Sequence, residues 1–86
     1  MIGPVPDLTD AQRAMLDFER EHWRYPAGKE VEVRQRFDLS LATYQQLLNT
    51  LLDEPAAMAH APATVRRLRR LRQKRLAARR QGRASA

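Results

Sequence analysis

Between Glu30 and Asp53, the spacing of the apolar residues predicts two short helices that meet at a tight turn. Val33 and Phe37 lie four residues apart and therefore share one face of the first helix. The segment Asp38 to Ser40 interrupts the helical period, because aspartate tolerates the left-handed conformation of a sharp helix end and serine is a good N-cap. The second helix carries an apolar stripe that must be buried, formed by Tyr44, Leu47, Leu48, Leu51 and Leu52.

This arrangement fits the helix-turn-helix pattern, in which the first half of the second helix enters the major groove of DNA. The positions that pack the two helices together are then all apolar or aromatic, namely Val33, Phe37, Leu39, Tyr44 and Leu47. Glutamine and asparagine can pair with adenine, and alanine or threonine methyl groups can contact thymine. We therefore predict base contacts from Leu41, Ala42, Thr43, Gln45, Gln46 and Asn49.

Two residues depart from that pattern and keep a second interpretation open. Arg34 stands where the tightest versions of the motif carry a small residue, and Asp38 replaces the usual glycine of the turn. Helical hairpins of this length also occur in small bundles that bind no DNA. The alternative is a purely structural hairpin, including one that forms the interface of a homodimer.

The length of the chain, 86 residues, limits it to one domain with a small core, since a chain of this size buries only about 60% of its unfolded surface. The sequence contains no cysteine, which excludes disulfides and thiolate metal sites. The first ten residues lack the pattern of a signal peptide, and no segment reaches the length of a membrane span. We expect a cytoplasmic protein that makes no membrane contact.

The order of the segments predicts an all-α fold, with a small three-helix helix-turn-helix body and a basic C-terminal helix. Thr9 and Gln12 have the spacing of a capping box at the start of the first helix, and Pro26 ends that helix. Pro55 and Pro62 bracket a connector with at most one helical turn, and Thr64 is a suitable N-cap for the last helix. The expected divisions are a flexible arm at 1–7, the helical domain at 8–63, the basic helix at 64–80 and a disordered tail at 81–86. In the basic helix, we expect the first half to dock on the body and the second half to project or fray.

Charge is distributed unevenly along the chain. Residues 1–65 hold six Lys or Arg against ten Asp or Glu, a net charge of −4, whereas residues 66–86 hold ten Lys or Arg and no acid, a net charge of +10. Guanidinium groups bind phosphate oxygens in pairs and keep their charge. We therefore predict phosphate contacts from Arg66, Arg67, Arg69, Arg70, Arg72, Lys74, Arg75, Arg79 and Arg80. The alternatives are pairing of these cations with the acidic body or with an acidic partner protein.

Nucleic acid, and duplex DNA in particular, is thus the expected partner. A transcriptional regulator and a nucleoid-associated protein both fit, with weak sequence specificity because the reading face lacks the Arg or Lys that most often contacts guanine. The alternative is an adaptor that binds RNA polymerase, the ribosome or another protein through the helical body and the basic helix. A homodimer is compatible with either function, and a palindromic DNA site would require one.

The sequence shows no arrangement typical of an enzyme, a metal site or a cofactor site. His22 and His60 have no cysteine or carboxylate at ligand spacing, and a lone histidine is a weak metal signal. No Ser-His-Asp arrangement or phosphate-binding glycine loop is present, and a small helical bundle offers little concave volume. We expect a protein that is not an enzyme and needs no cofactor.

The first helix and the residues after it hold further acidic and aromatic side chains. Asp17, Glu19 and Glu21 are expected to be solvated or paired with neighbouring arginines. Trp23 is expected in the core, as is common for a large aromatic that closes a helix in a small bundle. Tyr25 is equally compatible with the core and with stacking on an unpaired base.

The order of these motifs resembles a family of small actinobacterial proteins that are classed as a domain of unknown function. The resemblance covers about Leu8 to Arg80, and Asp38 departs from it because relatives often carry glycine there. It implies an all-helical cytoplasmic protein and supplies no established activity. Its shared elements are Phe18-Glu19-Arg20, Trp23, Lys29-Glu30, Phe37-x-Leu39-Ser40, the stripe from Tyr44 to Leu52 and the basic final helix.

Overall fold

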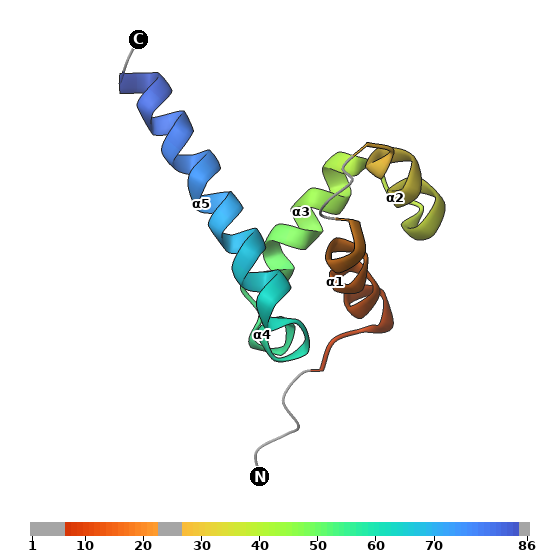
Figure 1. Ribbon diagram of the computed structural model, residues 1–86. Coiled ribbons are helices and arrows are strands. Elements are labelled where there is room, and N and C mark those ends of the chain that lie inside the picture. The colour runs from red at the N-terminus through yellow and green to blue at the C-terminus, as the bar shows by residue number, and fades with distance from the viewer. Residues whose placement is uncertain (1–6, 23–26, 85–86) are drawn as a thin grey trace.

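Five helices make up the part of the chain that the computed structural model describes, which is residues 7–22 and 27–84 (Figure 1). No strand occurs among these residues, so the predicted all-α fold class is confirmed. Trp23 and Tyr25 lie outside the described residues, as do residues 1–6 of the expected arm. The helices are α1 (Asp10–His22), α2 (Lys29–Phe37), α3 (Leu41–Leu51), α4 (Pro55–His60) and α5 (Pro62–Ala84).

The starts of α1 and α3 and the turn before α3 follow the capping signals in the sequence. The backbone N–H of Thr9 donates to the Gln12 side chain at 2.8 Å, and the backbone N–H of Gln12 donates to the Thr9 hydroxyl at 3.1 Å. The Ser40 hydroxyl accepts the backbone N–H of Thr43 at 3.2 Å and so caps α3. Asp38 has φ 54° and ψ 40°, the left-handed conformation that ends α2. The predicted capping box and the predicted turn are therefore confirmed.

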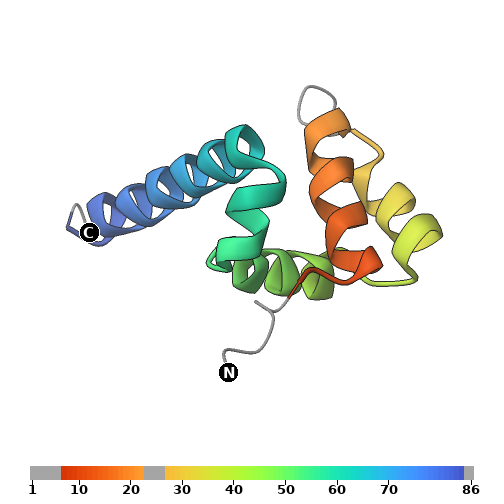
Figure 2. The same ribbon diagram turned by 90° about the horizontal axis from the view of Figure 1, so that it is seen from below.

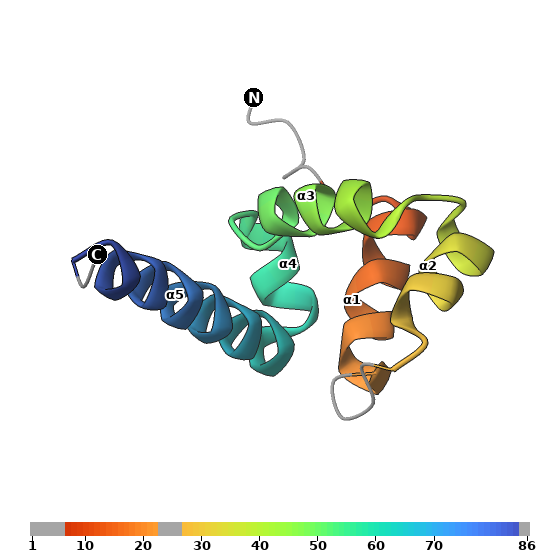
Figure 3. The same cartoon turned by 90° about the horizontal axis from the view of Figure 1, so that it is seen from above.

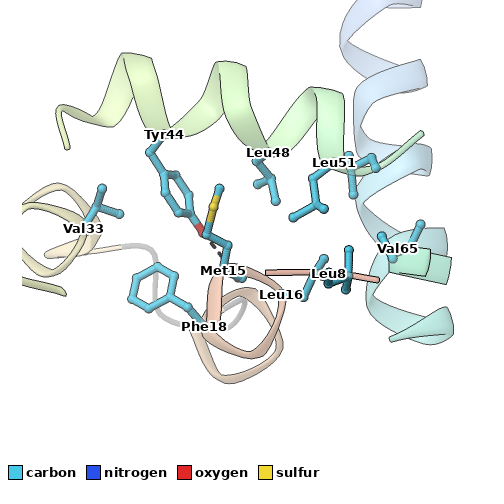
Figure 4. Packing of buried hydrophobic residues seen from close by; sticks show 11 residues of the cluster. Leu8, Met15, Leu16, Phe18, Val33, Tyr44, Leu48, Leu51 and Val65 are labelled. Carbon is cyan, nitrogen blue, oxygen red and sulfur yellow. Dashed lines mark hydrogen bonds between the residues drawn. The ribbon is translucent and has the colours of Figure 1, made fainter. Parts of the chain in front are cut away.

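The core lies between α1 and α3 and continues to the first turns of α5. Figure 4 shows Tyr44 and Leu48 of α3 pointing toward Met15 and Phe18 of α1. Tyr44 is fully buried, and its ring meets that of Phe18 edge to face with the centroids 5.9 Å apart. Each fully buried side chain of this size contributes about 1.5–3 kcal/mol by leaving water. The buried apolar residues are Leu8, Met15, Leu16, Phe18, Val33, Tyr44, Leu48, Leu51, Leu52, Ala57 and Val65.

One member of the stripe predicted for α3 is exposed. Leu47 keeps 48% of its surface in solvent, whereas the other four members are nearly fully buried. The buried face follows four- and three-residue steps from Tyr44 to Leu48 to Leu51, and adjacent residues in a helix are rotated by about 100°. Leu47 therefore falls at the edge of this face, and the prediction that it packs α2 against α3 is wrong. The other predicted packing positions, Val33, Phe37, Leu39 and Tyr44, are buried or partly buried.

The C-terminal part of the chain holds more helix than the sequence predicted. The expected connector contains α4, so the body has four helices rather than three, and α5 starts at Pro62. Proline suits the first turn because its missing N–H is not needed there, and Ala61 before it has φ −143°, outside the helical region. Thr64 is consequently not an N-cap and lies buried in the first turn, with 4% exposed. Arginine and glutamine are good helix formers, and α5 continues past the predicted end at residue 80 to Ala84.

The second half of α5 stands away from the body (Figures 1 and 2). Val65 is fully buried and Leu68 is partly buried, whereas residues 73–82 are exposed. The radius of gyration is 14.9 Å, larger than the value of about 12 Å typical of a globular chain of this length. The expectation that the first half of α5 docks and the second half projects is confirmed.

Candidate nucleic-acid interface

A buried carboxylate joins three helices at the centre of the body. Glu19 of α1 is 4% exposed, and it accepts a 2.7 Å hydrogen bond from the hydroxyl of Tyr44 in α3. The ammonium group of Lys29 in α2 lies 2.8 Å from the same carboxylate. Burial raises the pKa of the Tyr44 hydroxyl well above its ordinary value, and the hydrogen bond to Glu19 and the negative charge of Glu19 act in the same direction. These bonds fix α3 relative to α1 and α2.

The prediction that Glu19 is solvated or paired with an arginine is wrong. Glu19 follows Met15 by four residues and Leu16 by three, so it lies in the middle of the apolar face of α1. A carboxylate at such a position must be paired when it is buried, and this position was the signal available in the sequence. The other two acids of that prediction are exposed and pair across helices, Asp17 with His60 at 3.1 Å and Glu21 with Arg36 at 3.9 Å.

The outer face of α3 is polar and uncharged. The helix contains no charged residue, and its solvent-facing side offers amides, the hydroxyls of Thr43 and Thr50, and methyl groups, with the exposed Leu47 at its edge. Figure 3 shows α3 lying across the top of α1 and α4, so this side is not covered by the other helices of the body. Four of the predicted base-contact residues are exposed, namely Ala42, Thr43, Gln46 and Asn49, whereas Leu41 and Gln45 are partly buried. The four exposed residues lie on one side of the helix.

Two arginines of α5 bind the C-terminal end of α3. The Arg69 guanidinium donates two hydrogen bonds to the carbonyl oxygen of Leu52, at 2.9 and 2.6 Å. Arg72 donates to the carboxylate of Asp53 at 2.9 Å and to the carbonyl oxygen of Asn49 at 3.3 Å. The hydrogen bond from Arg72 holds the pKa of the Asp53 carboxyl below its ordinary value. Both guanidinium groups thus bind the protein itself, although we predicted them to be phosphate contacts.

A third arginine of α5, Arg67, contacts α1. Its guanidinium donates to the backbone carbonyl oxygen of Glu19 at 2.9 Å. Burial lowers the pKa of Arg67, and the negative charge of Glu19 opposes this change. The expected alternative of internal pairing is therefore realised in part, through Arg67, Arg69 and Arg72, and mostly through carbonyl oxygens.

The other predicted phosphate-contact residues point to solvent. Arg66, Arg70 and Lys74 follow one another at four-residue steps, which places them in one row about 6 Å apart along the helix. This row lies on the side of α5 opposite to Val65 and Leu68, the residues that pack on the body. The exposed cations are Arg66, Arg70, Lys74, Arg75, Arg79 and Arg80, and they form no ion pair within the described part of the chain.

A groove of about 160 Å³ lies between α3 and the first half of α5 and is also lined by Glu19 and His22 of α1 and by Lys29 of α2. Gln45 and Asn49 line it from α3, and Arg72 and Arg75 line it from α5. Leu71, which is 40% exposed, forms part of its wall. The amide groups of α3 and the guanidinium groups of α5 therefore open onto the same hollow, and the two sets of predicted contact residues meet there.

The two histidines each lie beside a carboxylate of another helix. His22 lies 3.4 Å from Glu32, and His60 bonds to Asp17, so each histidine faces a single carboxylate. Within residues 7–22 and 27–84, no group of three or more His, Cys, Asp or Glu is placed to hold a metal ion. None of the helices in the same residues combines the length and the apolar character needed to cross a membrane.

Comparison with known proteins identifies a family but no activity. A family model described as a protein of unknown function (DUF3263) matches residues 7–80, a stretch that includes α1 to α4 and most of α5. No match was found among curated proteins or among solved structures. Because the family model covers most of the chain, this protein belongs to the DUF3263 family.

Proposed function

We propose that this protein binds duplex DNA, with α2 and α3 acting as a helix-turn-helix and with α5 contacting the phosphate backbone. The observation that carries the proposal is the set of exposed cations on α5, which form no ion pair in the described residues, beside the neutral polar face of α3. Phosphate contacts supply affinity and orientation, and contacts to base edges supply sequence preference. The two helices divide these two tasks between them.

The reading helix in this proposal is α3. Its first half presents Ala42, Thr43 and Gln46, and Asn49 follows one turn later on the same side. Amide side chains can pair with adenine, and methyl groups can contact the thymine methyl, so a preference for A·T base pairs is expected. The specificity should be weak because α3 carries no arginine or lysine to read guanine. A nucleoid-associated role fits this profile, and so does a regulator with a loosely defined site.

The phosphate contacts in this proposal come from the six exposed cations of α5. Neutralising a phosphate releases counterions, so the logarithm of the binding constant falls by about 0.9 per contact for each unit of log salt. Six contacts would give a slope of about −5. Arg67, Arg69 and Arg72 are already bonded to the body and are not counted.

The direct test is a titration of a labelled duplex of about 25 base pairs, followed by fluorescence anisotropy in about 50 mM salt. We expect a dissociation constant in the low micromolar range or tighter, because even non-specific binders reach about 10⁻⁴ to 10⁻⁶ M at physiological salt. An absence of binding at these concentrations would refute the proposal. A single strand of the same length serves as the control, and it should bind more weakly if α3 uses the major groove.

The alternative proposal is an adaptor for RNA polymerase, the ribosome or another protein. The observation that favours it is the presence of exposed leucines, since Leu47 on α3 and Leu71 and Leu76 among the cations of α5 keep 48%, 40% and 38% of their surface in solvent. Exposed leucines suit a protein partner better than a phosphate backbone. Co-purification of a protein partner that survives nuclease treatment would favour this function, and loss of the partner on nuclease treatment would favour DNA binding.

A further inference from the structure

We infer that Arg69 and Arg72 are positioning residues that lock α5 at one angle to α3. The cations on the free side of α5 are thereby held at a fixed place relative to the reading face of α3. The lock is a property of the protein alone, whereas its consequence for DNA rests on the function proposed above. The two parts can be tested separately.

Arg69 and Arg72 bind the C-terminal end of α3, where backbone carbonyl oxygens are available as hydrogen-bond acceptors. The last carbonyl groups of α3 have no partner within the helix and carry the negative end of its dipole. Arg69 places two N–H groups on the Leu52 oxygen, and Arg72, one turn further along α5, reaches the Asn49 oxygen and the Asp53 carboxylate. Two successive turns of α5 are thus bonded to one end of α3.

These bonds are the hydrogen bonds and the ion pair that join α5 to the end of α3 in the described residues. The backbone of α5 packs most closely on α4 and α1, and α3 is not among its closest neighbours. Val65 and Leu68 bury apolar surface at the start of α5, but apolar burial has little directional preference. Hydrogen bonds weaken steeply when their angle changes, so the pairs formed by Arg69 and Arg72 select one orientation. Without them, the bond from Arg67 to the Glu19 carbonyl oxygen would be the remaining directional contact of α5 with the body among the described bonds, and α5 could pivot about that point.

A fixed α5 has a specific consequence for DNA binding. A helix that can change its orientation loses conformational entropy when DNA binding fixes it, and this loss lowers the affinity. A helix whose orientation is already fixed in the unbound protein avoids most of that loss. Loss of the lock should therefore weaken DNA binding by about tenfold while leaving the number of phosphate contacts unchanged. Loss of exposed cations should instead reduce the number of contacts and flatten the salt dependence.

The lock can be measured without DNA, because the sequence has no cysteine and accepts two spin labels at chosen sites. We would label Ala42→Cys in α3 and Ala77→Cys in α5, both exposed, and record the distance distribution by double electron–electron resonance. A single narrow distribution is expected in the parent chain, and a broad one after Arg69→Met and Arg72→Met. A distribution that stays narrow in this variant would overturn the inference.

A matched control removes the same number of guanidinium groups from the opposite side of α5. Arg66→Met with Arg70→Met should leave the distance distribution narrow, because both residues are exposed and outside the contact with α3. If this control also broadens the distribution, the effect is one of charge or helix content and the inference fails. Should Arg69→Met with Arg72→Met prevent folding, Asp53→Asn keeps both arginines and removes only the charged acceptor of Arg72. This variant should broaden the distribution by a smaller amount, and no broadening would count against the lock.

The same variants separate the lock from the proposed function. In DNA titrations at several salt concentrations, Arg69→Met with Arg72→Met should lower the affinity about tenfold at an unchanged slope. Arg66→Met with Arg70→Met should make the slope shallower by about 1.8. Equal changes of slope in both variants would show that Arg69 and Arg72 contact phosphate, which contradicts a positioning role. If the parent chain binds no DNA, the proposed function fails while the distance measurement still decides the lock.

Discussion

The hydroxyl of Tyr44 donates a 2.7 Å hydrogen bond to the buried carboxylate of Glu19, and this bond ties α3 to α1 in the middle of the core. Lys29 of α2 pairs with the same carboxylate at 2.8 Å. The outer face of α3 therefore owes its position to a polar contact on its inner face. Variants on the inner face of α3 should accordingly lower the stability of the protein, whereas variants on the outer face should change binding and leave the stability nearly unchanged.

Replacing Tyr44 by phenylalanine should destabilise the protein while keeping the packing of the ring. The Glu19 carboxylate would lose a hydrogen bond in a buried site, and such bonds to charged groups contribute about 1.5–3 kcal/mol. Urea denaturation followed by circular dichroism measures the change. An unchanged midpoint would show that Glu19 does not depend on this bond.

Two adjacent leucines of α3 provide a matched pair of core and surface substitutions. Leu48 is 3% exposed, so Leu48→Ala should lower the free energy of unfolding by about 2–5 kcal/mol through lost burial and a cavity. Leu47 is 48% exposed, and Leu47→Ala should change it by no more than about 0.5 kcal/mol. Similar losses in the two variants would place Leu47 in the core and contradict the described face of α3.

Tyr44 should resist ionisation at alkaline pH. Its folded-state pKa lies well above the ordinary value of 10.0, so the unfolded chain loses the proton first as the pH rises. The contribution of the protonated Tyr44 hydroxyl to the stability of the folded state is fully present below pH 10 and is lost as the pH rises beyond that value. Absorbance of the phenolate in a Tyr25→Phe background isolates Tyr44, and its signal should appear together with unfolding. A reversible titration of the folded protein near pH 10 would contradict the buried hydrogen bond.

Asp53 should titrate below its ordinary pKa of 3.8, because Arg72 donates a hydrogen bond to the ionised form. A depressed pKa contributes stability above the unfolded value, and this contribution disappears as the pH falls through the folded value. The contact between α3 and α5 should thus persist at neutral and mildly acidic pH and weaken in strong acid. Carbon-detected NMR of the Asp53 carboxyl measures the midpoint. In Arg72→Gln the midpoint should move up toward 3.8, and no movement would contradict the pairing.

Local signals in the sequence predicted the starts of α1 and α3 and the turn before α3 correctly. Thr9 with Gln12, Ser40 and Asp38 act within a few residues of their own position, so their chemistry can be read without knowledge of the fold. The same holds for the docking of the first half of α5, since Val65 and Leu68 repeat at helical spacing. These features place the ends of α2 and α3 close to their observed positions.

Pairings between distant segments could not be predicted from the sequence. Glu19 meets Tyr44 and Lys29 only after three helices have packed, and Arg69 meets Leu52 only because α4 turns the chain back. The phosphate contacts were predicted from charge alone, although Val65 and Leu68 mark the side of α5 that faces the body and Arg69 and Arg72 flank that side. The prediction for Leu47 was wrong for a different reason. The apolar residues of α3 form a stripe that is wider than the buried face, and the sequence alone does not show which residue lies outside that face.

The salt dependence of DNA binding, measured for the parent chain and for a variant with Arg66→Gln, Arg70→Gln and Lys74→Gln, tests the central proposal most directly. These three residues form the exposed row on α5. We predict low-micromolar or tighter binding of duplex DNA by the parent chain at about 50 mM salt, with a slope of about −5 that becomes shallower by about 2.7 in the variant. The parent chain failing to bind, or the variant keeping both the affinity and the slope, would contradict the proposal.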